Sequence, residues 1–336
     1  MPPCTDVGPD MRRRQFLSVL SGAAAAAWPF AARGQQAMPV IGWLSALSRP
    51  SAEPHLDMLR SGLGEAGFVE GRNVAIEYRF ADGQYDLLQA FATEFVRRPV
   101  DLIVAQSPPA ALAAKAASTT IPTVFAVGLD PVVAGLVASF NRPGGNATGM
   151  ALIPGPLVQK RLEVIRELLP KAADVVLLVN PASPEAAVEV RDIQAAAPAS
   201  RLQVRVLNAT TPAELDAARA ALTERRPDAL LIGGDPFFVN RRQDIVEWVA
   251  RVGLPTVYPF RQFPEVGGLI SYGVNLVTPY RQVGIYAGRI LRGTKPADLP
   301  VMQPTALELV INLKTAKTLG VEIPPILQAR SDEVIE

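Results

Sequence analysis

Short apolar runs alternate with amphipathic stretches from about residue 38 to the end of the chain. The apolar runs have the length of buried strands, and the stretches between them have the length and periodicity of helices. Strands that alternate with helices in this way form parallel sheets built from strand–helix–strand units. The alternation therefore predicts an α/β fold with strands near 40–44, 74–78, 102–105, 123–127, 175–179, 203–207, 229–232, 256–258, 269–272 and 307–311.

Proline- and glycine-rich segments at 143–146 and 154–156 divide this pattern into two rounds of similar length. Two rounds predict two lobes joined by a hinge, with a cleft between them. We expect lobe 1 to comprise residues 38–150 plus approximately 272–300. We expect lobe 2 to comprise residues 151–271 plus approximately 301–330.

The first 34 residues have the features of an export signal. Arg13 and Arg14 form a twin-arginine pair, and an alanine-rich apolar run follows over 17–32. This run is shorter than the roughly 20 residues that a membrane span needs. We expect a twin-arginine signal over residues 1–34, cleaved near Gly34, and a periplasmic protein without a lipid anchor. Export by the general route and a buried alanine-rich helix are the alternatives.

Composition excludes several classes of protein. The chain has 33 Lys and Arg against 32 Asp and Glu, and a body without basic runs lacks the charge of a nucleic-acid binder. The single cysteine is Cys4 and the single histidine is His55. A disulfide framework and a Cys/His metal site are therefore excluded, and we expect neither a metal nor a cofactor.

The glycine pattern at 62–67 has the letters GxGxxG, but it closes an expected helix and precedes a strand. A dinucleotide site needs the opposite order, so we expect Gly67 to end the helix in a left-handed conformation. The sequence contains neither a phosphate-binding P-loop nor a GxSxG nucleophile motif. His55 is the only candidate base for a catalytic triad, and we expect it at the surface or in a capping role. These observations disfavour an enzyme.

Polar or aromatic residues follow the expected strands, and in parallel α/β sheets ligands bind beyond the carboxyl ends of the strands. All but the first of these residues precede a proline, which is also typical of helix capping, so a capping role is the alternative for each. Helix N-termini that face one cleft would suit a carboxylate. The candidate ligand-binding residues at strand ends are Ser45, Ser107, Asp130, Asn180, Asp235 and Tyr258.

Three further candidates are Ser183, Arg261 and Tyr272. Arg261 could pair with a ligand carboxylate, and Asp130 or Asp235 could receive an ammonium group. We expect Tyr258, Arg261 and Tyr272 near the hinge. Several aromatic residues near the strand ends are candidates for the walls of a pocket, whereas Trp43, inside a strand, is expected in the core.

Six segments of the chain match a known pattern in order: Gly71-Arg72-Asn73-Val74, 109–115, Asp130-Pro131 with Gly135-Leu136-Val137, 142–146, 267–273 and 329–335. From about Met38 to Glu336 the chain resembles the ABC-transporter substrate-binding proteins of the tryptophan/tyrosine-type group. The resemblance implies two Rossmann-like lobes of the periplasmic-binding-protein type I kind and a small ligand such as an aromatic amino acid. This chain departs from the family at Pro108, where threonine is common.

From these features we expect an extracytoplasmic solute-binding protein of an ABC importer, a monomer that delivers its small-molecule ligand to a membrane permease. The ligand would be an aromatic amino acid or a related carboxylate. A binding module that serves a sensor is the first alternative, and an α/β enzyme on the same scaffold is the second.

Overall fold

The computed structural model describes Met1, residues 38–152 and residues 157–336. Contacts join Pro39–Glu336 into one unit. Apart from Met1, the expected export signal and Cys4 lie outside the described residues.

The first sheet contains five parallel strands in the order β2-β1-β3-β4-β5. Four of them follow the apolar runs expected from the sequence. The fifth was not expected, because its sequence Ala-Thr-Gly-Met-Ala has small residues and a glycine, which are poor strand formers. The strands are β1 (Val40–Ser45), β2 (Ala75–Phe80), β3 (Leu102–Gln106), β4 (Thr123–Val127) and β5 (Ala147–Ala151).

The second sheet contains seven strands in the order β12-β11-β10-β9-β8-β6-β7. All neighbours are parallel except β10 and β11, which pair antiparallel with Ile270 opposite Ile311. The strands are β6 (Asp174–Val179), β7 (Gln203–Asn208), β8 (Ala229–Ile232), β9 (Thr256–Tyr258), β10 (Ile270–Val274), β11 (Leu307–Asn312) and β12 (Glu333–Ile335). Two lobes with mainly parallel sheets confirm the expected fold class.

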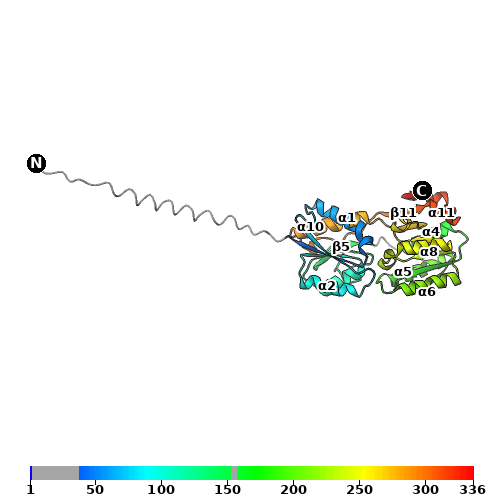
Figure 1. Cartoon of the computed structure of the whole chain (residues 1–336), viewed down its shortest axis with the longest axis horizontal. Helices are drawn as coiled ribbons and strands as arrows, with labels where there is room; N and C mark the ends of the chain where they lie inside the picture. The colour runs from blue at the N-terminus through cyan, green and yellow to red at the C-terminus, as the bar shows by residue number, and fades with distance from the viewer. Residues whose placement is uncertain (2–37, 153–156) are drawn as a thin grey trace. The chain divides into compact units, whose positions relative to one another are not determined.

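Helices cover both faces of each sheet. Helices α1 and α10 pack on one face of the first sheet, and α2 and α3 pack on the other, as Figure 1 shows for α1, α10 and α2. In the second lobe α6 and α8 cover one face of the sheet, and α4, α5, α11 and α12 cover the other. The helices are α1 (Arg49–Glu65), α2 (Leu87–Arg97), α3 (Pro108–Ala117), α4 (Leu157–Leu168), α5 (Ala186–Ser200), α6 (Pro212–Glu224), α7 (Pro236–Asn240), α8 (Arg242–Val252), α9 (Gln262–Glu265), α10 (Val277–Leu291), η1 (Pro296–Asp298), α11 (Leu313–Leu319) and α12 (Pro325–Ala329).

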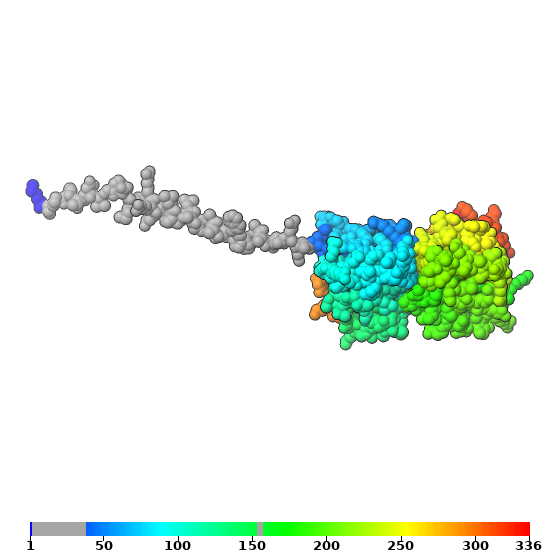
Figure 2. Space-filling view, turned by 60° about the horizontal axis from the view of Figure 1, so that its bottom comes forward, coloured from blue at the N-terminus to red at the C-terminus, as the bar shows by residue number. Residues whose placement is uncertain are grey.

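The chain passes between the two sheets three times: after β5, after β10 and between η1 and β11. The last passage is tied to the first sheet, because Ala151 N donates to Met302 O at 2.9 Å and Met302 N donates to Gly149 O at 3.0 Å. In Figure 2 the orange residues of the α10 region accordingly lie with the blue and cyan residues, while the red C-terminal residues lie with the yellow ones. We take the first sheet with α10 as lobe 1 and the second sheet with its helices as lobe 2.

Helices α1 and α10 approach so closely that glycine is required at their crossing. A Cβ atom at Gly62 would lie 1.9 Å from Arg281 O, and a Cβ atom at Gly284 would lie 2.2 Å from Leu59 O. The GxGxxG letters thus serve helix packing at Gly62, and Gly67 adopts a φ of 76° just after the helix, which confirms its expected role. Trp43 is fully buried in the core, as expected.

Candidate functional site

Asp235 lies at the centre of a polar cluster that both lobes contribute to. It is the N-cap of α7, and its Oδ1 accepts hydrogen bonds from Phe237 N at 2.9 Å and Asn180 Nδ2 at 3.0 Å. Its Oδ2 accepts a hydrogen bond from the hydroxyl of Tyr85 at 2.7 Å. Tyr85 comes from the loop before α2 in lobe 1, so this bond joins the lobes. Asp235 therefore has a capping role and a role between the lobes.

Burial raises the pKa values of both Asp235 and Tyr85. Asp235 is 3% exposed, and burial raises the pKa of its carboxyl, although the hydrogen bonds from Tyr85 and Asn180 oppose that shift. Burial, and then the neighbouring Asp235 charge, raises the pKa of Tyr85. Tyr85 therefore stays a neutral hydrogen-bond donor at neutral pH.

Ser183 and Glu185 extend the cluster. The Ser183 hydroxyl donates to Glu185 Oε2 and also lies close enough to Asp235 to lower the pKa of that carboxyl. Glu185 Oε1 faces lobe 1 at the end of β4, where a Cβ atom on Gly128 would lie 3.2 Å from it. Burial raises the pKa of Glu185 to about 8. Tyr85, Asn180, Ser183, Glu185 and Asp235 are called the interlobe cluster below.

Ser45 and Ser107 lie at neighbouring strand ends in lobe 1. The Ser45 hydroxyl is buried and donates to Gln106 Oε1 at 2.7 Å. Ser107 precedes α3 with a φ of 97°, a backbone conformation that residues other than glycine rarely adopt. Its hydroxyl is buried without a hydrogen-bond partner among the described residues. A strained residue with a free buried hydroxyl is typical of functional sites.

Asp130 does not join the interlobe cluster. It is exposed, and its Oδ1 accepts hydrogen bonds from Val132 N at 2.8 Å and Val133 N at 3.2 Å. These bonds close a turn after β4, which is the local role that its place before a proline also suggested.

Three of the expected ligand-binding residues, Tyr258, Arg261 and Tyr272, are engaged by other residues of lobe 2. Tyr258 is fully buried and stacks on Phe263 with ring centroids 4.7 Å apart. Tyr272 lies in β10 and packs against the core of that lobe. Arg261 makes ion pairs with three carboxylates, at 2.7 Å to Glu265, 3.2 Å to Glu308 and 2.6 Å to Glu333. Its guanidinium is therefore already engaged.

The expected surface or capping role of His55 is wrong. The ring is 5% exposed and stacks on Tyr280 with centroids 4.2 Å apart, and the N-cap of α1 is Ser48. The charged neighbours of His55 in the sequence lie on the opposite face of the helix, which is why they gave no indication of burial. Burial, assisted by the nearby Arg242 charge, lowers the pKa of His55 to about 4, so the ring is neutral at pH 7.

A second contact between the lobes involves the start of α1. Asn240 Oδ1 of lobe 2 accepts a hydrogen bond from Ser48 N at 2.9 Å, and Arg242 Nη1 donates to Ser51 Oγ at 2.8 Å. These bonds and the interlobe cluster are two sets of polar contacts between the lobes, and a shared apolar core cluster joins them as well.

Sequence reasoning missed Tyr85, Gln106 and Glu185. Gln106 is the last residue of β3, and the rule that residues at strand ends line the site could have found it. Tyr85 and Glu185 carry no such signal, because a tyrosine in a loop and a glutamate at a helix start are common. Their role depends on contacts with the other lobe.

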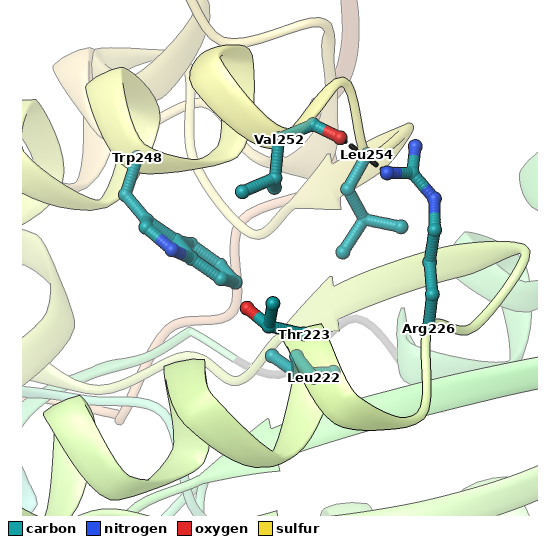
Figure 3. A pocket seen from close by; sticks show the side chains of 6 residues that line it. All are labelled: Leu222, Thr223, Arg226, Trp248, Val252 and Leu254. Atoms are coloured by element: carbon teal, nitrogen blue, oxygen red, sulfur yellow. Dashed lines mark hydrogen bonds between the residues drawn. The ribbon is translucent and has the colours of Figure 1, made fainter.

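A pocket of about 210 Å³ lies elsewhere on lobe 2, between the C-terminal ends of α6 and α8 (Figure 3). Its lining residues precede β8 and β9, so it lies at the opposite edge of the sheet from Asp235. Figure 3 shows the ring of Trp248 facing Thr223 across the pocket. Arg226 Nη2 already donates to Gly253 O at 2.6 Å. We assign no ligand to this pocket.

The described residues offer neither a metal site nor a membrane span. Across 38–152 and 157–336, no three His, Cys, Asp or Glu side chains are grouped so that they could hold a metal ion. In the same ranges, no helix has both the length and the apolar character needed to cross a membrane.

Comparison with known proteins identifies a family. Residues 41–335 match the family described as ABC transporter substrate binding protein. A curated tyrosine-binding protein from Clostridioides difficile (strain R20291) is 28% identical over 284 residues, which cover 82% of this chain and 80% of that protein.

Two solved structures cover nearly the same share of the chain. The first is an ABC domain from Streptococcus pneumonia in complex with L-Trp, with 26% identity and a TM-score of 0.81 over 88% of this chain and 99% of the other. The second is a ligand-free, open substrate binding protein with adhesive properties from Clostridium difficile. It has 26% identity and a TM-score of 0.63 over 89% of this chain and 99% of the other. The solved neighbours have the type I periplasmic-binding-protein fold, as expected for this chain.

Proposed function

Since this chain belongs to the family of ABC transporter substrate-binding proteins, we propose that it binds a small ligand between its lobes and delivers it to a membrane permease for import. The ligand class that we propose first is an aromatic amino acid or a related carboxylate. The observation that carries this proposal is the position of Asp235, a buried carboxylate whose hydrogen-bond donors come from both lobes.

The strand ends that meet at the lobe boundary support a ligand at this place. Ser107 offers a buried hydroxyl without a partner, and Asn180 and Ser183 lie on the opposite lobe. Asp235 could receive the ammonium group of an amino acid. Asp130, Tyr258, Arg261 and Tyr272 have roles within one lobe, so we place them outside the first contacts of the ligand.

The arrangement of the lobes supports a clamshell mechanism. At the same 26% identity, the structure is more similar to the L-Trp complex than to the ligand-free, open protein, with TM-scores of 0.81 and 0.63. A ligand that touches both lobes only in the closed form shifts the population toward closure. The closed form would then be the one that the permease recognises.

The relatives also support an extracytoplasmic location. We propose that residues 1–34 direct export by the twin-arginine route and that cleavage near Gly34 releases the protein, which acts as a monomer in the periplasm.

A ligand screen tests the proposed function. We expect residues 35–336, freed of ligand, to gain thermal stability with at least one member of a panel. The panel contains L-tyrosine, L-tryptophan, arylalkyl carboxylates and arylalkyl amines. At 100 times the dissociation constant, mass action predicts a gain of about 2.7 kcal/mol in the free energy of unfolding. Calorimetric unfolding measures the gain. A flat response to every member of the panel would contradict the proposal.

A further inference from the structure

Two carboxyl groups lie at the lobe boundary without a basic partner. The donors to Asp235 are uncharged: a tyrosine hydroxyl, a side-chain amide and a backbone amide, with the Ser183 hydroxyl close by. Glu185 accepts one from the Ser183 hydroxyl. Within residues 38–152 and 157–336, no Lys, Arg or His nitrogen lies in ion-pair range of either carboxyl. The charge on Asp235 contributes to the raised pKa of Glu185, after burial.

Two arginines lie near these carboxyl groups, and each is engaged elsewhere. Glu189, one turn along α5 from Glu185, forms a 3.0 Å ion pair with the buried Arg161. Arg241 lies over the ring of Phe237 at 4.0 Å and donates to Phe237 O. Neither arginine is in ion-pair range of the interlobe cluster, so the cluster has an excess of negative charge when both carboxyls are ionised.

A buried carboxylate without a cation is costly, and a ligand that brings a positive charge removes that cost. Of the arginines in this region, Arg161 and Arg261 are held by glutamates. Arg241 has no carboxylate partner among the described residues, but it lies over the ring of Phe237, outside ion-pair range of Asp235 and Glu185. We therefore propose that the cleft selects a cationic organic amine, that Asp235 and Glu185 together bind its nitrogen, and that a ligand carboxylate is not required. This inference rests on the proposed function, and it replaces a zwitterion by an amine as the preferred ligand.

Proton release is a consequence of this arrangement. Burial holds the pKa of Glu185 at about 8, so the free protein carries a proton there at pH 7. An ammonium group beside the carboxyl favours its ionised form and lowers its pKa in the complex. At a pH between the pKa of Glu185 in the complex and its pKa in the free protein, the complex binds fewer protons than the free protein. Binding therefore releases a proton, and affinity rises with pH up to about 8.

Six compounds in two matched sets, one with a phenol ring and one with an indole ring, test the proposal on the protein of residues 35–336. Tyramine and tryptamine carry the amine alone, L-tyrosine and L-tryptophan carry amine and carboxylate, and 3-(4-hydroxyphenyl)propionate and indole-3-propionate carry the carboxylate alone. Titration calorimetry at pH 7 should show that one amine binds at least as tightly as the matching amino acid. The matching carboxylate should bind about 100-fold more weakly, the value of losing charge-assisted hydrogen bonds in a buried site.

Glu185→Gln supplies the second measurement, because it keeps the shape of the side chain and removes its charge. Calorimetry in buffers of different ionisation enthalpy should show proton release with the wild type at pH 7. It should show none with Glu185→Gln, whose affinity for the amine should fall about tenfold at pH 8. Circular dichroism and unfolding temperature check that the variant is folded.

The outcomes separate the two proposals. The inference is overturned if the carboxylate binds more tightly than the matching amine, or if the amino acid binds tenfold more tightly than the amine. Either outcome leaves the proposed function in place. Amine binding without proton release overturns the role of Glu185. Binding by none of the six compounds counts against the proposed function itself, and the inference fails with it.

Discussion

Asp235 shows how one residue can serve both local structure and the lobe boundary. A helix cap satisfies a backbone N–H, and the same carboxylate has a second oxygen that accepts from Tyr85 on the other lobe. Capping alone is a stability effect within lobe 2. The bond to Tyr85 exists only when the lobes are together.

Replacement of Asp235 by alanine separates the two roles. We expect Asp235→Ala to lower the free energy of unfolding of the ligand-free protein by about 1 kcal/mol, the usual value of a lost cap. We expect ligand affinity to fall by more than tenfold, because the variant loses a buried carboxylate at the site. Urea unfolding and calorimetric titration measure the two quantities.

Thr211→Ala is the matched control. Thr211 caps α6 in the same lobe, its side chain accepting from Glu214 N at 3.2 Å, and it lies at the start of a helix outside the interlobe cluster. It should lose a similar amount of stability and keep its affinity. A loss of affinity in Asp235→Ala no greater than in Thr211→Ala would assign Asp235 to capping alone.

At the scale of residues, the sequence predicts the candidate residues at strand ends but not the partners that they meet on the other lobe. A Ser, Asn or Asp between a strand and a proline marks a strand end, so Ser107, Asn180 and Asp235 could be placed from local pattern. Tyr85 could not, because its partner is 150 positions away and on the other lobe. Arg261 and His55 show the same limit. Three carboxylates engage the guanidinium of Arg261, and the ring of Tyr280 stacks on His55. The pattern of neighbouring residues in the sequence did not predict these contacts.

At the scale of elements, the packing of α10 on α1 depends on small residues. Helices can approach this closely only where side chains are absent, and Gly62 and Gly284 supply the space. The strand–helix alternation predicts most elements, because apolar periodicity follows directly from burial. It does not predict β5, whose small residues carry no strand signal, or the antiparallel pairing of β10 with β11, which depends on the path of the chain.

Two alanine substitutions in one helix test this packing. Gly62→Ala should destabilise the protein by about 1–3 kcal/mol, because the new methyl group would overlap Arg281 O unless the helices separate. Gly64→Ala, two residues away, meets no atom within 4 Å and should stabilise by about 0.5–1 kcal/mol through helix propensity. Chemical unfolding of both variants provides the comparison. Equal effects would contradict close packing at Gly62.

At the scale of the whole molecule, two sets of polar contacts connect the lobes, one through Tyr85 and Asp235 and one through Asn240 and Arg242. Buried apolar side chains of both lobes also belong to one core cluster, among them Leu47 of lobe 1 and Phe238 of lobe 2. An opening motion therefore has to break these polar contacts and expose part of that apolar surface. The two-lobed division was predictable from the sequence, because two rounds of alternation are visible there. The partners across the boundary were not.

Small-angle scattering tests closure. We expect the radius of gyration of residues 35–336 to fall when L-tyrosine or tyramine is added. Tyr85→Phe should need about tenfold more ligand for the same compaction, because it loses a hydrogen bond to a carboxylate across the boundary. Tyr78→Phe is the control, since Tyr78 donates to Glu70 at 2.6 Å within lobe 1. An unchanged radius of gyration at saturating ligand would contradict the clamshell mechanism.

The three passages of the chain between its sheets have a consequence for biosynthesis. The first sheet lacks one of its covering helices until α10 has left the ribosome, and the second lacks an edge until β11 and β12 follow. Neither half can mature while the polypeptide is still growing, so an incomplete nascent chain exposes apolar surface on both. A protein built this way must finish translation before it matures, which fits a route that carries cargo across the membrane already folded.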